Sequence, residues 1–323
     1  MNVSRLIPTV TLAGAVALGL TALTACSSSN AAGHKDDGKL NVVASFYPMQ
    51  FLAEQIGGKH VSVTTLTKPG VEPHDLELTP RQIGGLADAD YILYLKGIQP
   101  AVDDAVLQSG AKHTVDASKL TTLERHGTET GDGHEHADEH GHDHDHGDEA
   151  GADPHIWLDP VKYAEVAKGV GKSLEKADPG HAADYRTNTD ALVGKIDALN
   201  TAYETGLKST ATRTFITTHS AFGYLAERYG LTQEGIAGVD PEAEPSPARI
   251  AEIHAIAKKN KVTTVFFETL ASDRTAKTLA RDTGLKTDVL DPLEGITDKS
   301  KGDDYIGVMR SNLAALQKAL GAK

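Results

Sequence analysis

Histidines and acidic residues alternate in the middle of the chain, in a His-rich loop between residues 126 and 149. This loop contains nine Asp or Glu residues and no Lys or Arg. Neutral imidazoles and carboxylates are nitrogen and oxygen donors for divalent metals. The composition predicts weak metal binding, although an inert acidic linker would have a similar composition. The candidates for an auxiliary metal loop are His134, His136, His140, His142, His144 and His146, and His126 precedes them.

Three other histidines occur where the sequence predicts ordered structure. His74 follows a predicted strand that ends at Leu66, and His219 directly follows residues 215–218, at the end of a strand predicted over 213–217. His155 lies in the proline-bounded stretch 153–160. Two carboxylates, Asp291 and Glu294, follow another predicted strand at 286–290. Ligands of open α/β sheets bind beyond the carboxyl ends of the strands, so we expect these side chains to share a site.

Three imidazoles and one carboxylate suit Zn²⁺, which prefers tetrahedral coordination by nitrogen and oxygen. Three neutral histidines and one carboxylate reduce the charge of the bound ion from +2 to +1. A lone histidine in a loop is more often a surface residue, and Asp291 before Pro292 is also typical of a turn. The residues therefore predict a metal site without deciding which carboxylate completes it.

The bulk composition excludes several classes of protein. The 323 residues suffice for two domains, and the formal net charge is −13, of which the nine acidic residues at 126–149 supply −9. An acidic chain without a basic patch argues against nucleic acid as a partner. The single cysteine, Cys26, excludes an internal disulfide and a cysteine-based zinc cluster.

The start of the chain has the pattern of an exported lipoprotein. Arg5 precedes an apolar stretch at 6–23, and residues 23–26 (Leu-Thr-Ala-Cys) resemble a bacterial lipobox. The resemblance implies a signal peptide at 1–25, a lipidated Cys26 and a flexible tether at 26–39. The protein would then be extracytoplasmic and lipid-anchored to the outer face of the cell membrane. A transmembrane anchor is the alternative, since about 20 apolar residues span a bilayer.

Short apolar runs alternate with helical patterns in both halves of the chain. This alternation predicts parallel strands and an α/β fold with two Rossmann-like lobes. Apolar residues spaced four, three, four and four apart from Leu192 to Leu207 predict a linking helix over 179–208, about 45 Å long. We expect an N-terminal lobe at 40–160, a linking region at 161–209 and a C-terminal lobe at 210–323, with the metal site in the cleft between the lobes.

Several stretches together resemble the metal-binding lipoproteins of bacterial ABC importers, in the zinc-importer (ZnuA-type) branch of the zinc and manganese group. The matching stretches are residues 72–80, 153–160, 217–225, 241–247 and 290–295, and the resemblance covers about residues 40–323. It implies metal ligation by His74, His155 and His219. It implies a fourth ligand that is an Asp or Glu from the segment 291–294, or a water. We favour Glu294, with Asp291 next and Glu72 as a weaker candidate. A His-rich loop before the second ligand histidine also matches the zinc branch.

The resemblance implies a monomeric, non-enzymatic zinc receptor that delivers Zn²⁺ to an ABC permease and its ATPase subunit. Transfer of metal from the His-rich loop to the cleft is a hypothesis. The alternatives are a manganese or iron receptor of the same fold, a zinc store or adhesin that uses only the loop, and a zinc hydrolase. The hydrolase would need an open metal position and a nearby general base, and the chain has no His-Glu-x-x-His motif.

Overall fold

Parallel strands form two four-stranded sheets in residues 38–126 and 151–322, the residues that the computed structural model describes. The first sheet has the order β2-β1-β3-β4 and the second the order β6-β5-β7-β8. Every neighbouring pair of strands is parallel. The strands are β1 (Leu40–Ala44), β2 (Val61–Thr65), β3 (Tyr91–Tyr94), β4 (His113–Asp116), β5 (Thr214–Thr217), β6 (Thr232–Gly235), β7 (Thr264–Phe267) and β8 (Lys286–Val289).

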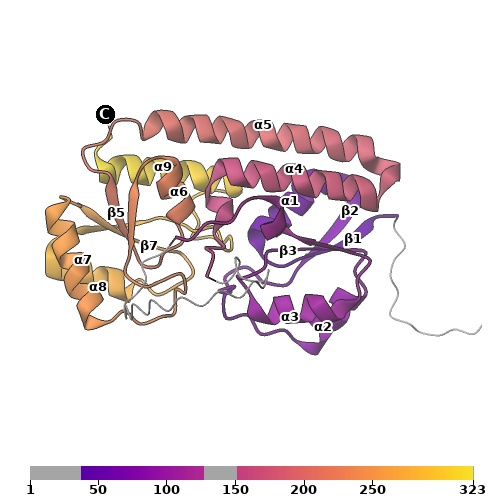
Figure 1. Cartoon of the computed structure of the whole chain (residues 1–323), viewed down its shortest axis with the longest axis horizontal. Helices are drawn as coiled ribbons and strands as arrows, with labels where there is room; N and C mark the ends of the chain where they lie inside the picture. The colour runs from indigo at the N-terminus through magenta and orange to yellow at the C-terminus, as the bar shows by residue number, and fades with distance from the viewer. Residues whose placement is uncertain (1–37, 127–150, 323) are drawn as a thin grey trace, which may run out of the picture. The chain divides into compact units, whose positions relative to one another are not determined.

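Helices connect the strands and cover both faces of each sheet (Figure 1). The α-helices are α1 (Tyr47–Gly57), α2 (Pro80–Ala87), α3 (Pro100–Ser109), α4 (Pro160–Ala177), α5 (Ala182–Gly206), α6 (Gly223–Arg228), α7 (Pro247–Lys259), α8 (Arg274–Thr283) and α9 (Tyr305–Leu320). Four short 3₁₀ turns are η1 (Gly58–His60), η2 (Ala117–Leu120), η3 (Ile156–Leu158) and η4 (Pro179–His181). Among the described residues, no helix combines the length and apolarity needed to cross a membrane.

The central strands β1, β3, β5 and β7 are mostly buried because helices cover both of their faces, whereas the edge strands β2, β4, β6 and β8 carry exposed polar residues. In β1, Val42 and Ala44 pack into a large core with α1 and α4, whereas Val43 packs on the opposite face with α2 and α3. In β5, Phe215 belongs to the large core, and Ile216 packs with α7 and α8. Alternate residues of a strand point to opposite faces, so a doubly covered parallel strand needs apolar residues at every position.

One continuous apolar core joins the two lobes. It includes Phe51 of α1 and Val166 of α4 beside the first sheet, Ile196 and Leu199 of α5, and Met309 of α9 beside the second sheet. Helix α5 packs on both α1 and α9, and in Figure 1 it extends from above the first sheet to above the second. Its 25 residues give a length of about 38 Å. The lobes are therefore connected by a stiff, buried element.

The predicted α/β architecture with two parallel lobes is confirmed, and two predicted helices begin later than expected. The linking helix starts at Ala182, because Pro179–His181 form a 3₁₀ turn. The Asp178 side chain accepts hydrogen bonds from His181 and Tyr185 in this turn. The sequence also predicts a helix over 220–229, but this helix starts at Gly223, since Ser220 is bound to the loop after β6.

Several predictions concern residues outside the described ranges. They are the signal peptide at 1–25, lipidation of Cys26, most of the tether at 26–39, the His-rich loop beyond His126, and the auxiliary ligands His134, His136, His140, His142, His144 and His146. The predicted domain boundaries also stay predictions.

Candidate metal centre

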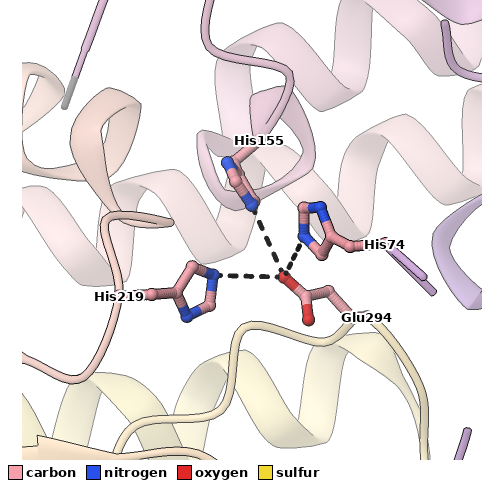
Figure 2. Close-up of side chains that lie close together, drawn as sticks. All are labelled: His74, His155, His219 and Glu294. Atoms are coloured by element: carbon pink, nitrogen blue, oxygen red, sulfur yellow. Dashed lines mark hydrogen bonds and ion pairs between the residues drawn. The ribbon is translucent and has the colours of Figure 1, made fainter. Parts of the chain in front are cut away.

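Three imidazoles converge on one carboxylate between the two lobes (Figure 2). The Nε2 atoms of His74, His155 and His219 each lie 3.4 Å from the same oxygen, Oε1 of Glu294. This distance is longer than a usual N–H···O hydrogen bond of about 2.7–3.2 Å. It equals the edge of a tetrahedron whose ligands lie about 2.0–2.1 Å from a central zinc ion. The spacing therefore fits a four-coordinate metal better than direct hydrogen bonding.

Each lobe contributes two of the four side chains. His74 lies in the loop after β2, and His155 lies between β4 and α4, directly before η3. His219 follows β5, and Glu294 lies in the loop between β8 and α9. All four positions lie beyond the carboxyl ends of parallel strands, where the sequence analysis placed them. Their roles as ligands stay predictions.

The cluster is buried and its inner atoms lack hydrogen-bond partners. The side chains of His155 and Glu294 are fully buried, and that of His74 is 12% exposed. Among the described residues, Nε2 of His155, Nε2 of His219 and Oε2 of Glu294 have no hydrogen-bond partner. Buried polar atoms are nearly always paired, so the unpaired Nε2 atoms beside the Glu294 carboxylate form an arrangement that could hold a cation.

Two further carboxylates orient the histidines from behind. Asp153 Oδ1 lies 2.7 Å from Nδ1 of His155 and also accepts the His155 backbone N–H. Glu268 Oε1 lies 2.7 Å from Nδ1 of His219 and accepts the Thr218 hydroxyl. An ionised carboxylate only accepts hydrogen bonds, so Nδ1 carries the proton and Nε2 presents its lone pair to the site.

Sequence reasoning did not assign these two orienting residues. Glu268 follows β7 directly, so the strand-end rule that selected His219 applied to it equally. Asp153 lies two residues before His155 in the proline-bounded stretch.

The electrostatic field of the site favours cations. Burial alone would lower the pKa of His219, but the negative charges of Glu268 and Glu294 raise it well above its ordinary value. Burial would also lower the pKa of His155, and Asp153 raises it overall. Burial would raise the pKa of Glu294, yet its three histidine neighbours hold it well below the usual range. A field that stabilises protons on imidazole also stabilises a metal ion there.

A strained turn aims Glu294 at the histidines. Leu293 has a φ of 59°, which is unfavourable for a side chain with a Cβ. Asp291 Oδ1 accepts the Leu293 backbone N–H at 2.9 Å. The Asn312 side chain bonds both the N–H and the C=O of Asp291, and Trp157 donates to the Pro292 carbonyl at 2.7 Å. These hydrogen bonds stabilise the turn despite the unfavourable backbone conformation of Leu293.

The structure does not place the other two candidate carboxylates among the converging atoms. Asp291 is outside the cluster because its two oxygens bind Leu293 N–H and the Thr269 hydroxyl. Its role is to shape the turn. Glu72 accepts the His74 backbone N–H at 3.1 Å. Burial and the charge of Glu294 raise the pKa of Glu72 to about 8.

The zinc-uptake complex component A family (ZnuA, periplasmic) matches residues 42–319. The chain belongs to this family. It is 39% identical over 308 residues to the high-affinity zinc uptake system protein ZnuA of Bacillus subtilis, covering 93% of this chain and 94% of that protein. It is 38% identical over 302 residues to the zinc-binding lipoprotein AdcA of Streptococcus pneumoniae. That match covers 92% of this chain but 58% of AdcA, so the chain spans little more than half of that relative.

A solved ZnuA-like structure supports the same fold. The Zn(II)-bound ZnuA-like domain of Streptococcus pneumoniae AdcA superimposes with a TM-score of 0.71 and 34% sequence identity. The superposition covers 88% of this chain and 99% of that domain. The two-lobe arrangement described above is therefore the ZnuA-like fold.

Removing one converging imidazole tests whether the cluster binds metal. We expect His155→Ala to weaken the tightest Zn²⁺ site by about 3 kcal/mol, roughly 100-fold, because zinc sites of four ligands contribute about 10–16 kcal/mol in all. Competition with a chelator of known affinity measures the change. The control is His113→Ala, an exposed histidine of β4. Equal affinity in both variants would place the tight site elsewhere in the chain.

Removing an orienting charge tests the role of Glu268. Glu268→Gln keeps the size of the side chain but removes the charge that fixes His219, and we expect zinc affinity to fall about 10–100-fold. The exposed Glu244→Gln is the matched control. Circular dichroism and thermal melting check that both variants fold. An unchanged zinc affinity with normal folding would show that Glu268 has no part in binding.

Proposed function

We propose that the protein is an extracytoplasmic receptor that captures Zn²⁺ with His74, His155, His219 and Glu294 and delivers it to an ABC permease driven by an ATPase subunit. The observation that carries the proposal is the equal 3.4 Å spacing of three Nε2 atoms from Glu294 Oε1. The family description, a zinc-uptake complex component, and the zinc-related names of the relatives support the same function.

Release of the ion depends on the division of ligands between the lobes. His74 and His155 belong to the first lobe, and His219 and Glu294 to the second. Separation of the lobes by a few ångströms would remove two of the four donors at once. Because α5 and the shared core connect the lobes stiffly, we expect a modest movement rather than a wide opening. Docking on the permease would provide the energy for it.

The same geometry favours a carrier over a zinc hydrolase. A catalytic zinc keeps an open position for water, whereas four protein donors fill a tetrahedral sphere. Two of the nearby carboxylates, Glu268 and Asp153, each use one oxygen to orient a histidine of the cluster. Neither is a free general base beside a metal-bound water. The arrangement therefore supports binding and transfer of the ion without chemistry.

The proposed envelope location and partners rest on sequence. Cys26 and the preceding apolar stretch support a lipid anchor, and AdcA is named a lipoprotein. The permease and ATPase follow from membership of an uptake complex. We propose a monomer, because the four candidate ligands all come from one chain.

Metal competition separates the zinc receptor from a manganese or iron receptor of the same fold. Three imidazoles suit Zn²⁺ better than Mn²⁺, which prefers oxygen donors and octahedral geometry. With equal concentrations of Zn²⁺ and Mn²⁺ and one equivalent of protein, we expect the tight site to retain zinc. Elemental analysis after rapid desalting measures the bound metals, and His155→Ala is the control for the tight site. Retention of manganese or iron at the tight site would identify the protein as a manganese or iron receptor of the same fold.

Zinc affinity should depend strongly on pH. Protons and Zn²⁺ compete for the same imidazole nitrogens, and the pKa values of His155 and His219 lie above the ordinary 6.5. As the pH is lowered, the affinity for Zn²⁺ should therefore begin to fall before pH 6.5 is reached. The fall should be up to about tenfold per pH unit for each proton displaced. Chelator competition from pH 8.5 to 5.5 measures the profile. A constant affinity down to pH 6 would contradict the proposed ligation.

A further inference from the structure

Helix α6 of the second lobe binds the first lobe beside the candidate metal centre. The helix begins four residues after His219. Tyr224, Glu227 and Arg228 are spaced three and four residues apart, so their side chains share one face of the helix. Each of these three side chains contacts a residue of the first lobe. A single short helix therefore connects the lobes at three points, close in sequence to a candidate ligand.

Arg228 holds α6 against the start of α4. Its guanidinium donates to both carboxylate oxygens of Asp159, at 2.7, 2.9 and 3.1 Å. Asp159 is 1% exposed and also accepts the Val161 backbone N–H, which caps α4. A buried carboxylate that loses its cationic partner is costly unless water can reach it. Loss of the Arg228 guanidinium would therefore favour movement of α6 away from the first lobe.

The Tyr224 hydroxyl connects α6 to the residue that orients His155. It accepts the Glu124 backbone N–H at 2.8 Å and donates to the Asp153 backbone carbonyl at 2.7 Å. The side chain of Asp153 in turn lies 2.7 Å from Nδ1 of His155. The helix that follows His219 thus holds the segment that carries His155. Displacement of α6 would change the positions of these two imidazoles relative to each other.

The N-terminus of α6 approaches the first lobe too closely for a side chain to fit. A Cβ on Gly223 would overlap the Cβ of His126 and would lie 3.0 Å from Oδ2 of Asp153. His126 also contacts the next turn of the helix, where its Nε2 lies 2.6 Å from Glu227 Oε2. The absence of a side chain at position 223 therefore lets the ion pair and the Tyr224 hydrogen bonds form at this short separation.

The two ion pairs of α6 lie at the solvent edge of this contact. The side chains of Arg228 and Glu227 are 35% and 60% exposed, and they line a cavity of about 290 Å³ together with Asp159 and Lys162. Partly exposed ion pairs exchange their partners for water at a small net cost. The pairs can therefore break and re-form, whereas the apolar core along α5 keeps the lobes connected.

We propose that α6 is a clasp that sets the distance between the lobes and thereby the rate at which the ion leaves the candidate metal centre. The α6 clasp consists of Gly223, Tyr224, Glu227 and Arg228. The inference rests on the proposed function, since it requires that the converging side chains hold the ion. The clasp residues are positioning residues, which act through His155 and His219. While the clasp is closed the donors converge, and when it opens His219 moves away from His155 and the ion is released.

The rate of Zn²⁺ dissociation tests the clasp. The full chain, loaded with one equivalent of Zn²⁺, is mixed with an excess of a chelator that fluoresces on binding the ion. Arg228→Gln should release the ion about tenfold faster, without slower association, because it loses one charge-assisted contact between the lobes. Arg228→Lys keeps the charge without the planar two-nitrogen geometry and should be intermediate. The matched control is Arg281→Gln, an arginine of α8 whose side chain is 75% exposed.

A second variant changes the approach of α6 without changing any charge. Gly223→Ala should also accelerate dissociation, because the added Cβ pushes the helix away from His126 and Asp153. Alanine is a better helix former than glycine, so α6 itself should not be weakened. Circular dichroism and thermal melting check that the variants fold. A role of α6 in stability alone would not make this helix-favouring substitution release the ion faster.

Distances between spin labels show whether the lobes move. The labels are attached through Leu107→Cys of α3 and Lys277→Cys of α8, one on each lobe, in a protein that carries Cys26→Ser. In the metal-free protein, Arg228→Gln and Gly223→Ala should lengthen or broaden the distance distribution measured by double electron–electron resonance. The control variant should match the parent protein.

Faster dissociation together with a changed interlobe distance in both variants would support the clasp. A dissociation rate equal to that of the parent would overturn it. Faster dissociation at an unchanged distance would also overturn it, because the spacing of the lobes would then not limit release. Failure of the proposed function would look different, since the parent protein itself would bind no tight Zn²⁺.

Discussion

The convergence of three imidazole nitrogens on one buried carboxylate oxygen is the constraint on which the rest of the structure depends. A buried ion is costly unless other charges and hydrogen bonds compensate it. Glu294 carries one negative charge and the three histidines are neutral, so a divalent ion together with these four side chains would have a net charge of +1. The orienting carboxylates Asp153 and Glu268, each 2.7 Å from an outer imidazole nitrogen, add further negative charge behind the histidines. A cation held at this cluster would be stabilised by three carboxylates, of which Glu294 alone would contact it.

Holding that arrangement requires rigid support from both lobes. The left-handed conformation of Leu293 costs on the order of 1–3 kcal/mol. Asn312 of α9 and Trp157 of η3 stabilise the turn from opposite sides with three hydrogen bonds. Trp157 precedes α4 and Pro292 follows β8, so this contact also connects the lobes beside the site. The shared core under α5 extends the same connection along the length of the linking helix.

Stiff lobes that carry the candidate ligands in loops suit a protein that must bind its ion tightly and still release it. The sheets and the shared core are stiff, whereas all four donors lie in loops at the ends of strands. Because each lobe contributes two donors, the affinity depends on the distance between the lobes. The same interlobe region contains the His126–Glu227 pair and the bidentate Arg228–Asp159 pair. Charged groups around the cleft thus connect the lobes at several points besides α5.

Sequence alone predicted the fold class, the three histidines that the structure brings together, and two candidate carboxylates, Asp291 and Glu294. Apolar runs of strand length alternating with helical patterns permit little besides doubly covered parallel sheets, and strand ends are where such sheets bind ligands. The tertiary structure decided between the carboxylates: Asp291 and Glu294 are only three residues apart, and the strained turn at Leu293 directs Glu294 inward while Asp291 binds backbone. It also places Asp153 and Glu268 against the outer ring nitrogens of His155 and His219, because contacts such as that between His219 and Glu268, 49 positions apart, depend on how the strands are ordered in space.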